Sequence, residues 1–250
     1  MAKELRDNVS RVKRINWFGT TVFVGLRAAD AFLQYALLRR GWASDLVRVV
    51  GGTSLAANLI VDGSMHLRPY YNLIAAMAFG SSLKQITHIF LVLEQEMSPS
   101  SAVTVALFNT VLNSLNTVFS VWAVTSQTPD SGNLASPLLL SAVGFYLIGI
   151  LMEAVSEIQR TAFKRDPANK GKPYAGGLFS LARHVNYGGY TIWRSAYALA
   201  SGGWAWGIAV FAFFFYDFAA RGVPVLDAYL SDRVSCASLA LLSHADIVLV

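Results

Sequence analysis

Long apolar runs are the feature of this sequence that most restricts its fold. A transmembrane helix needs about 20 mainly apolar residues in succession to cross the hydrocarbon core of a bilayer. Because lipid offers no hydrogen-bond partners to a free backbone, such continuous runs favour helices. We predict an all-α protein, a multi-span transmembrane helical bundle with six to seven membrane segments. The predicted spans are Trp17–Leu38, Asp45–Val61, Tyr70–Leu93, Ser101–Thr125, Pro137–Val155 and Gly203–Ala220, with the shorter Tyr187–Ala200 as a half-span or one arm of a hairpin.

Composition supports a membrane location for the whole chain, which we treat as a single membrane domain, residues 1–250. Charged residues make up only 14% of the sequence, whereas soluble domains carry about 25%. The net charge of +5 comes mainly from basic residues near the N-terminus and in one loop, a pattern typical of residues that flank membrane spans. These features indicate a lipid bilayer as partner and argue against nucleic acid. The basic loops leave the orientation of the chain open.

Several predicted spans contain ionisable or amide side chains. Arg27 and Asp30 lie three residues apart, and Lys84 and His88 lie four apart. Such groups usually face the interior of a bundle or a wet cavity. We interpret Arg27 and Asp30 as an ion pair, with a functional role as the alternative; for Lys84 and His88 the alternatives are structural pairing, snorkelling or function. Three asparagines share one helix face and either line a polar cavity or hold helices together: Asn109, Asn113 and Asn116.

The stretch from Glu153 to Trp193 contains the densest set of chemically useful side chains. Glu153 and Glu157 are four residues apart and share a helix face. After a basic loop come Arg183, whose guanidinium suits phosphate, and several further polar and aromatic residues. This pattern predicts a pocket for a nucleotide or a similar anionic cofactor at the membrane–cytoplasm boundary. The alternative is an interfacial belt that binds lipid headgroups.

Two motifs in this stretch resemble the C-terminal domain of the steroid 5-alpha-reductase family. They are Glu-x3-Glu-x-Gln-Arg-x2-Phe, starting at Glu153, and Gly-Leu-Phe-x3-Arg-His-x-Asn-Tyr-Gly-Gly, starting at Gly177. The resemblance covers about residues 152–230. It implies transmembrane helices in residues 1–150, a reductase-like region in 151–233 and an atypical tail in 234–250. It also implies a reductase of the endoplasmic reticulum membrane or an equivalent membrane, which transfers hydride from NADPH to a carbon–carbon double bond in a steroid- or lipid-like substrate.

The resemblance also assigns roles to residues. By matched position, it places in the cofactor region Glu157, Lys164, Arg183, His184, Asn186 and Tyr187. Glu96 lies in a segment similar to one that carries a catalytic carboxylate in the family. A protonated carboxyl there would stabilise negative charge on an enone oxygen, and burial in an apolar bundle would raise its pKa enough to keep it protonated.

The sequence also departs from the family. Val185 stands in place of a proline and Tyr190 in place of a glutamate, and the tail Val234–Val250 lacks the expected tyrosines and basic residues. Two alternatives therefore stay open. One is a membrane methyltransferase that uses S-adenosylmethionine, because such enzymes carry a similar Arg-His-x-x-Tyr core. The other is a non-catalytic, degenerate membrane protein. The four histidines are scattered and Cys236 is the only cysteine, so we predict no metal site.

Overall fold

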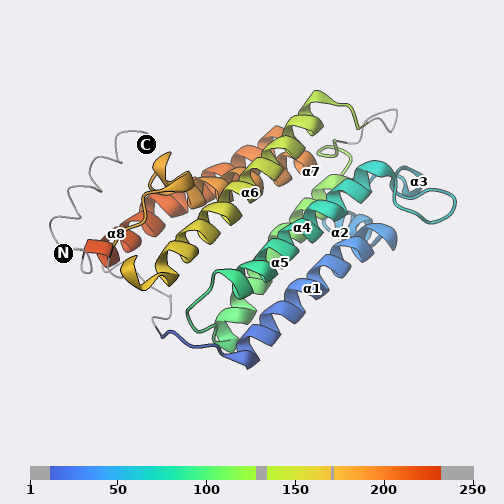
Figure 1. Cartoon of the computed structure of the whole chain (residues 1–250). Helices are drawn as coiled ribbons and strands as arrows, with labels where there is room; N and C mark the ends of the chain where they lie inside the picture. Colours follow the sequence, from blue (N-terminus) through green and yellow to red (C-terminus); the bar gives the residue numbers. More distant parts are fainter. Residues whose placement is uncertain (1–11, 128–133, 170–171, 232–250) are drawn as a thin grey trace, which may run out of the picture.

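The computed structural model describes residues 12–127, 134–169 and 172–231, with side chains up to Asp227. Long helices run side by side along one common direction (Figure 1). Within the described residues, β pairing is limited to two isolated bridges. This confirms the all-α helical bundle. The long helices are α1 (Trp17–Arg39), α4 (Pro69–Leu91), α5 (Pro99–Val121), α6 (Pro137–Arg165) and α7 (Val185–Asp217).

Shorter elements connect the long helices. They are α2 (Trp42–Val49), α3 (Ala57–Ile60), the 3-10 helices η1 (Pro167–Asn169) and η2 (Gly177–Ser180), the π-helical segment η3 (Phe218–Gly222) and α8 (Val223–Ser231). Among the described residues, four helical segments are long and apolar enough to cross a membrane. They are α1, α5, α6 and the continuous segment Val185–Asp227. These helices are consistent with an integral membrane protein, and the number of crossings stays a prediction.

The starts of the long helices follow from local sequence. Asn16 precedes α1 and its side chain accepts a hydrogen bond from the backbone N–H of Gly19 at 3.1 Å. Ser98 caps α5 in the same way, through the N–H of Ser101 at 3.2 Å. A proline occupies the first turn of α4, α5 and α6, where its missing N–H removes no intrahelical bond. Helix starts at residues 17, 69, 99 and 137 lie within two residues of the predicted ones.

The predicted span Asp45–Val61 is wrong. The helix α2 ends at Val49 after eight residues, and α3 has only four. Gly51 between them has a φ of 79°, which reverses the chain. A Cβ added at Gly52 would lie 2.6 Å from the ring of Trp122, so the backbone here packs directly against an indole. Two adjacent glycines therefore end the helix within an otherwise apolar run.

The helix α7 folds back on itself at Gly203, whose φ of 71° and ψ of −167° lie outside helical values. The rings of Tyr190 and Phe214 are 5.0 Å apart, although 24 residues of straight helix would separate them by about 36 Å. Gly207 likewise faces Leu199 across the reversal. The two arms of α7 are therefore antiparallel, which confirms the hairpin interpretation of Tyr187–Ala200.

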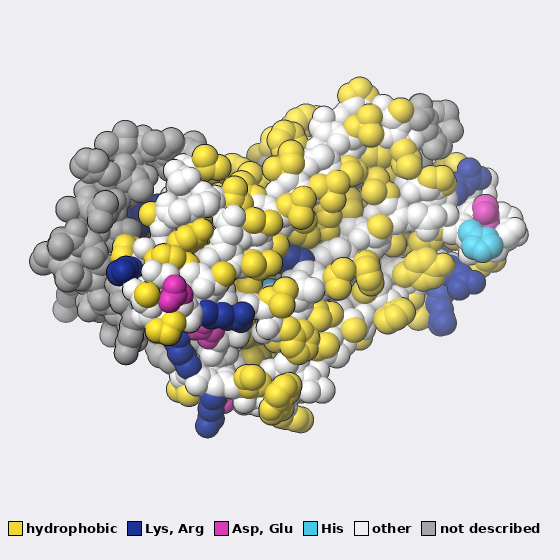
Figure 2. All heavy atoms as spheres, in the orientation of Figure 1, with side chains coloured by type: hydrophobic (Ala, Val, Ile, Leu, Met, Phe, Trp, Pro, Cys, Tyr) yellow, Lys and Arg dark blue, Asp and Glu magenta, His cyan; other side chains and the backbone are white. Residues whose placement is uncertain are grey.

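The helices form two groups: α1, α4 and α5 in one, and α6 with the arms of α7 in the other (Figure 1). Hydrogen bonds from buried tyrosines join the groups. Tyr146 donates to the carbonyl of Met77 at 2.7 Å, and Tyr70 donates to that of Ala200 at 2.9 Å. On the face shown in Figure 2, charged side chains gather at the two ends and the middle is mainly hydrophobic. This distribution fits a molecule whose middle lies in lipid.

A buried polar network lies between α1, α4 and α5. Arg27 and Asp30 form the expected ion pair, at 2.9 Å and with no exposed side-chain area. Asp30 also accepts a hydrogen bond from Asn113 at 2.7 Å. Asn109 accepts from Gln85 of α4 at 2.6 Å, and Asn116 accepts from Trp206 of α7 at 2.7 Å. The asparagines therefore hold helices together, which was one of the two interpretations left open.

Candidate functional site

The predicted cofactor residues lie at the end of the bundle where α6 ends, α7 begins and α8 packs. We call this region the polar end. Close approach of α6 and α7 sets its geometry, because a Cβ at Gly189 would lie 2.7 Å from the backbone nitrogen of Glu153. A Cβ at Gly149 would likewise lie 2.6 Å from the nitrogen of Trp193. These glycines bring the two backbones close enough for short side chains to meet across the interface.

Glu157 is the centre of the polar end. Its side chain is almost fully buried, and Asn186 Nδ2 donates a hydrogen bond to Oε1 at 2.6 Å. Arg160, one turn further along α6, forms an ion pair with the other carboxylate oxygen. The guanidinium of Arg160 also lies 5.8 Å from the centre of the Phe179 ring. Two elements far apart in sequence therefore fix one buried carboxylate.

Arg183, His184 and Tyr187 form the adjoining part of the polar end. Arg183 Nη2 donates to Asp227 Oδ1 at 2.7 Å, and His184 Nε2 lies 3.8 Å from the same oxygen. The rings of His184 and Tyr187 stack at 5.6 Å, and Tyr187 stacks on Phe218 at 4.5 Å. Residues of η3 and α8 thus complete a layered arrangement that begins at the start of α7.

The 3-10 helix η2 covers the end of α6. Gln159 accepts a hydrogen bond from the backbone N–H of Leu178 at 3.0 Å. Gly177 has a φ of 56°, and a Cβ there would lie 2.3 Å from Gln159 Oε1. There is therefore no room for a side chain at position 177 beside the Gln159 carboxamide. Lys164 lies in the last turn of α6, where its charge interacts with those of Glu157 and Arg160.

Glu96 does not have the surroundings expected of it. It lies in the loop between α4 and α5, where Arg14 Nε donates to its carboxylate at 2.7 Å and Asn16 Nδ2 at 2.9 Å. The hydrogen bonds from Arg14 and Asn16 lower the pKa of Glu96. The expectation that burial raises this pKa and keeps the carboxyl protonated is therefore wrong. A catalytic role for Glu96 stays a prediction.

A second buried carboxylate lies one turn from Glu157. Glu153 accepts a hydrogen bond from Trp193 Nε1 at 2.7 Å and forms an ion pair with Lys84 of α4. This confirms the pairing interpretation for Lys84. The sequence shows two lone charges inside apolar runs, which signals that each needs a partner. It contains no signal that pairs these two residues, because they lie 69 positions apart.

A hollow of about 650 Å³ lies away from the polar end, between α6 and the arms of α7. Its lining is apolar except for small hydroxyl and backbone groups and includes Pro137, Phe145 and Phe211. No charged side chain lines it. The groups suited to chemistry are therefore at the polar end and along the adjacent turn of α6, and not in this hollow.

These features define a class: a helical integral membrane protein with a buried polar cluster at one end. The profile of a family described as "Protein of unknown function (DUF1295)" matches residues 69–233, about two thirds of the chain. The chain belongs to this family, which is steroid 5-alpha-reductase-like, so the coarser resemblance is confirmed. It is also similar to the "Probable O-methyltransferase ustE" of Ustilaginoidea virens, with 39% identity over 225 residues, which is 86% of this chain and 79% of the relative. No solved structure matches the chain.

Proposed function

We propose that this protein is a membrane-bound NAD(P)H-dependent reductase of a carbon–carbon double bond in a steroid- or lipid-like substrate, with NADPH as the expected cofactor. The observation that carries the proposal is the meeting of the predicted cofactor residues at the polar end. Glu157, Asn186 and Tyr187 lie together with Arg183 and His184, although Glu157 and Arg183 are 26 positions apart in the sequence. The proposed location is an integral membrane position, which in a eukaryotic cell is the endoplasmic reticulum membrane.

The chemistry of the polar end suits a dinucleotide. The guanidinium groups of Arg160 and Arg183 match phosphate oxygens, and in this structure they contact the carboxylates of Glu157 and Asp227. The ring of His184, which stacks on Tyr187, would lie beside a base or nicotinamide. NADPH, when bound, supplies a hydride to one carbon of the double bond and becomes NADP⁺, while the other carbon takes a proton. Asn186 holds Glu157 in place throughout, because its amide donates to that carboxylate.

A second function is favoured by one comparison. The relative from Ustilaginoidea virens carries the name of an O-methyltransferase and is similar over most of this chain. The shared Arg-His-x-x-Tyr core, here Arg183 to Tyr187, also fits a membrane methyltransferase. In that case the polar end would bind S-adenosylmethionine, and a methyl group would pass from its sulfonium to a substrate oxygen that loses a proton.

One titration separates the two functions. The full chain is purified in lipid nanodiscs and titrated with NADPH, NADH and S-adenosylmethionine in parallel. We expect NADPH to bind, with affinity reduced at least about tenfold in Arg183→Ala and in Asn186→Ala, since each removes a hydrogen-bonding side chain from the polar end. Arg48→Ala is the matched control, because Arg48 is exposed and pairs with Asp45 in α2. Binding of S-adenosylmethionine alone would establish the second function, and binding of neither cofactor would refute both.

A further inference from the structure

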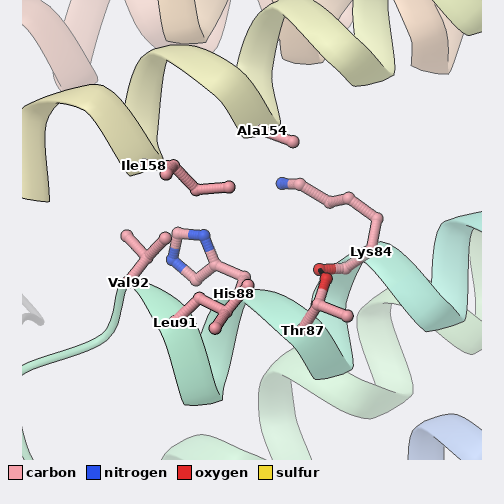
Figure 3. A pocket seen from close by; sticks show the side chains of 7 residues that line it. All are labelled: Lys84, Thr87, His88, Leu91, Val92, Ala154 and Ile158. Atoms are coloured by element: carbon pink, nitrogen blue, oxygen red, sulfur yellow. Dashed lines mark hydrogen bonds between the residues drawn. The ribbon is translucent and has the colours of Figure 1, made fainter. Parts of the chain in front are cut away.

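A small cavity lies at the seam between the two helix groups. It has a volume of about 20 Å³, and Lys84 and His88 extend into it from α4 towards α6 (Figure 3). The remaining lining is mainly apolar and comes from both helices: Thr87, Leu91, Val92, Ala154 and Ile158. A volume of this size admits one oxygen-sized group, since a water needs roughly 10–15 Å³ by the same measure.

The outer rim of the seam is apolar and exposed. Leu91 and Ile158, which line the cavity on opposite helices, are 52% and 45% exposed. An apolar molecule that reaches the seam from the lipid would therefore first meet hydrophobic side chains. The first charged group inside this apolar rim is the ammonium of Lys84, whose side chain is only 9% exposed.

The Lys84–Glu153 pair differs from the buried Arg27–Asp30 pair. Arg27 and Asp30 are enclosed completely, and serine, glutamine and asparagine side chains take up further hydrogen bonds. Lys84 lies at the edge of a cavity instead. An ammonium has three N–H donors, of which Glu153 accepts one. The geometry therefore leaves donor capacity beside a space that fits one acceptor oxygen.

The position of this pair relative to the polar end is also informative. Glu153 precedes Glu157 by one turn of α6, about 6 Å along the helix axis. Trp193, which donates to Glu153, follows Asn186 by two turns of α7. An oxygen bound at Lys84 would therefore place the neighbouring atoms of its molecule within about one helical turn of the predicted cofactor residues.

We propose that Lys84 and the adjoining cavity form a substrate subsite, which binds the oxygen of a hydrophobic ketone or alcohol that enters from the bilayer. Glu153 and Trp193 position the ammonium. This subsite would select the substrate class of the proposed reductase. Its role in catalysis rests on the proposed function, because hydride addition to an enone builds negative charge on the oxygen, which the ammonium would stabilise. The binding step itself requires no cofactor.

The test compares two probes that differ only in the oxygen, cholest-4-en-3-one and cholest-4-ene. Binding of each radiolabelled probe to the full chain in nanodiscs is measured without cofactor, and empty nanodiscs supply the background. We expect the ketone to bind at least about tenfold more tightly than the hydrocarbon. The reason is that its oxygen accepts a hydrogen bond from the Lys84 ammonium in a site shielded from water. Lys84→Met should remove the difference, and Lys172→Met, in an exposed loop position, should keep it.

A second variant separates loss of the subsite from loss of the fold. Lys84→Met leaves the Glu153 carboxylate buried without its ammonium, whereas Lys84→Met/Glu153→Gln removes both charges. Equal binding of the two probes by the wild-type chain, or a retained ketone preference in the folded double variant, would overturn the proposal. NADPH titration of the same samples distinguishes the two proposals. Ketone preference without NADPH binding refutes the reductase and supports the subsite. NADPH binding without ketone preference supports the reductase and refutes the subsite.

Discussion

Asp30 is the residue on which the buried network of the first helix group most depends. In Asp30→Ala the guanidinium of Arg27, which is fully buried, loses its counter-charge, and Asn113 loses an acceptor. We expect the free energy of unfolding to fall by about 3–5 kcal/mol, because an uncompensated buried charge is strongly unfavourable. Unfolding in detergent measures this loss. Asp45→Ala is the control, since its pair with Arg48 is exposed and should change the stability by less than about 1 kcal/mol; equal losses in the two variants would contradict the argument.

Residue-level prediction succeeded where both partners are close in sequence. Arg27 and Asp30 share a helix face at a spacing of three, so their pairing follows from helix geometry. The partner of Lys84 did not follow, because only the packing of α4 on α6 brings Glu153 to it. For Glu96 the sequence predicted surroundings that the structure does not have. Its motif predicted burial, but basic residues before α1 reach the same loop and bind its carboxylate.

At the scale of elements, the reversal inside α7 depends on a single glycine. Gly203 has a backbone conformation that is nearly restricted to glycine, and a Cβ there would lie 2.8 Å from Gln127 Nε2. We expect Gly203→Ala to destabilise the protein by about 1–3 kcal/mol, measured as a lower unfolding temperature in detergent. Gly144→Ala in α6 is the matched control, because nothing lies within 4 Å of its added Cβ and alanine favours helix. A neutral Gly203→Ala would show that the arms do not need this conformation.

The segment before α1 is attached to the α4–α5 loop by ion pairs that depend on pH. Lys13 pairs with Glu94 and Arg14 with Glu96. Hydrogen bonds from the two basic side chains lower the pKa of both glutamates. A depressed carboxyl pKa contributes to attachment above the ordinary glutamate pKa, about 4.3, and this contribution is lost as the pH falls through the lower value of the folded state.

We therefore expect the segment to stay attached at neutral pH and to detach in acid. Spin labels at Ile15→Cys and Ser100→Cys, in a Cys236→Ser background, report the distance between the segment and the start of α5. The distance distribution should broaden below about pH 4, and Arg14→Gln should show a broadened distribution already at pH 7. An unchanged distribution in acid would mean that the ion pairs do not hold the segment.

Element boundaries were predictable where proline or a capping side chain marks them, as at Pro69, Pro99 and Pro137. The predicted span Asp45–Val61 failed because hydropathy alone does not register two consecutive glycines that turn the chain. The hairpin of α7 could be suggested from sequence, since a glycine pair separates two apolar runs. Its geometry could not, because it depends on contacts between residues such as Tyr190 and Phe214.

At the scale of the whole molecule, the two ends of the bundle differ in charge and in chemistry. The end with α2 and α3 carries Arg39, Arg40, Arg48 and Arg68. Among the residues that the structure describes, the polar end carries more basic ones, namely Lys13, Arg14, Arg160, Lys164, Arg165, Lys172, Arg183 and Arg221. The excess of lysine and arginine beside membrane spans favours the cytoplasmic side. The structure sorts the basic loops by the end at which they lie, so the positive-inside rule now predicts one orientation.

We expect the polar end to face the cytoplasm, where a cytosolic dinucleotide would reach it. Single cysteines are introduced as Lys172→Cys and Arg40→Cys in a Cys236→Ser chain, which otherwise has no thiol. In sealed microsomes with the cytoplasmic face outward, a membrane-impermeant maleimide should label Lys172→Cys at once and Arg40→Cys only after detergent is added. The reverse pattern would place Glu157 and Arg183 on the lumenal side. It would contradict both the charge argument and the proposed use of cytosolic NADPH, while the helical packing described above would be unaffected.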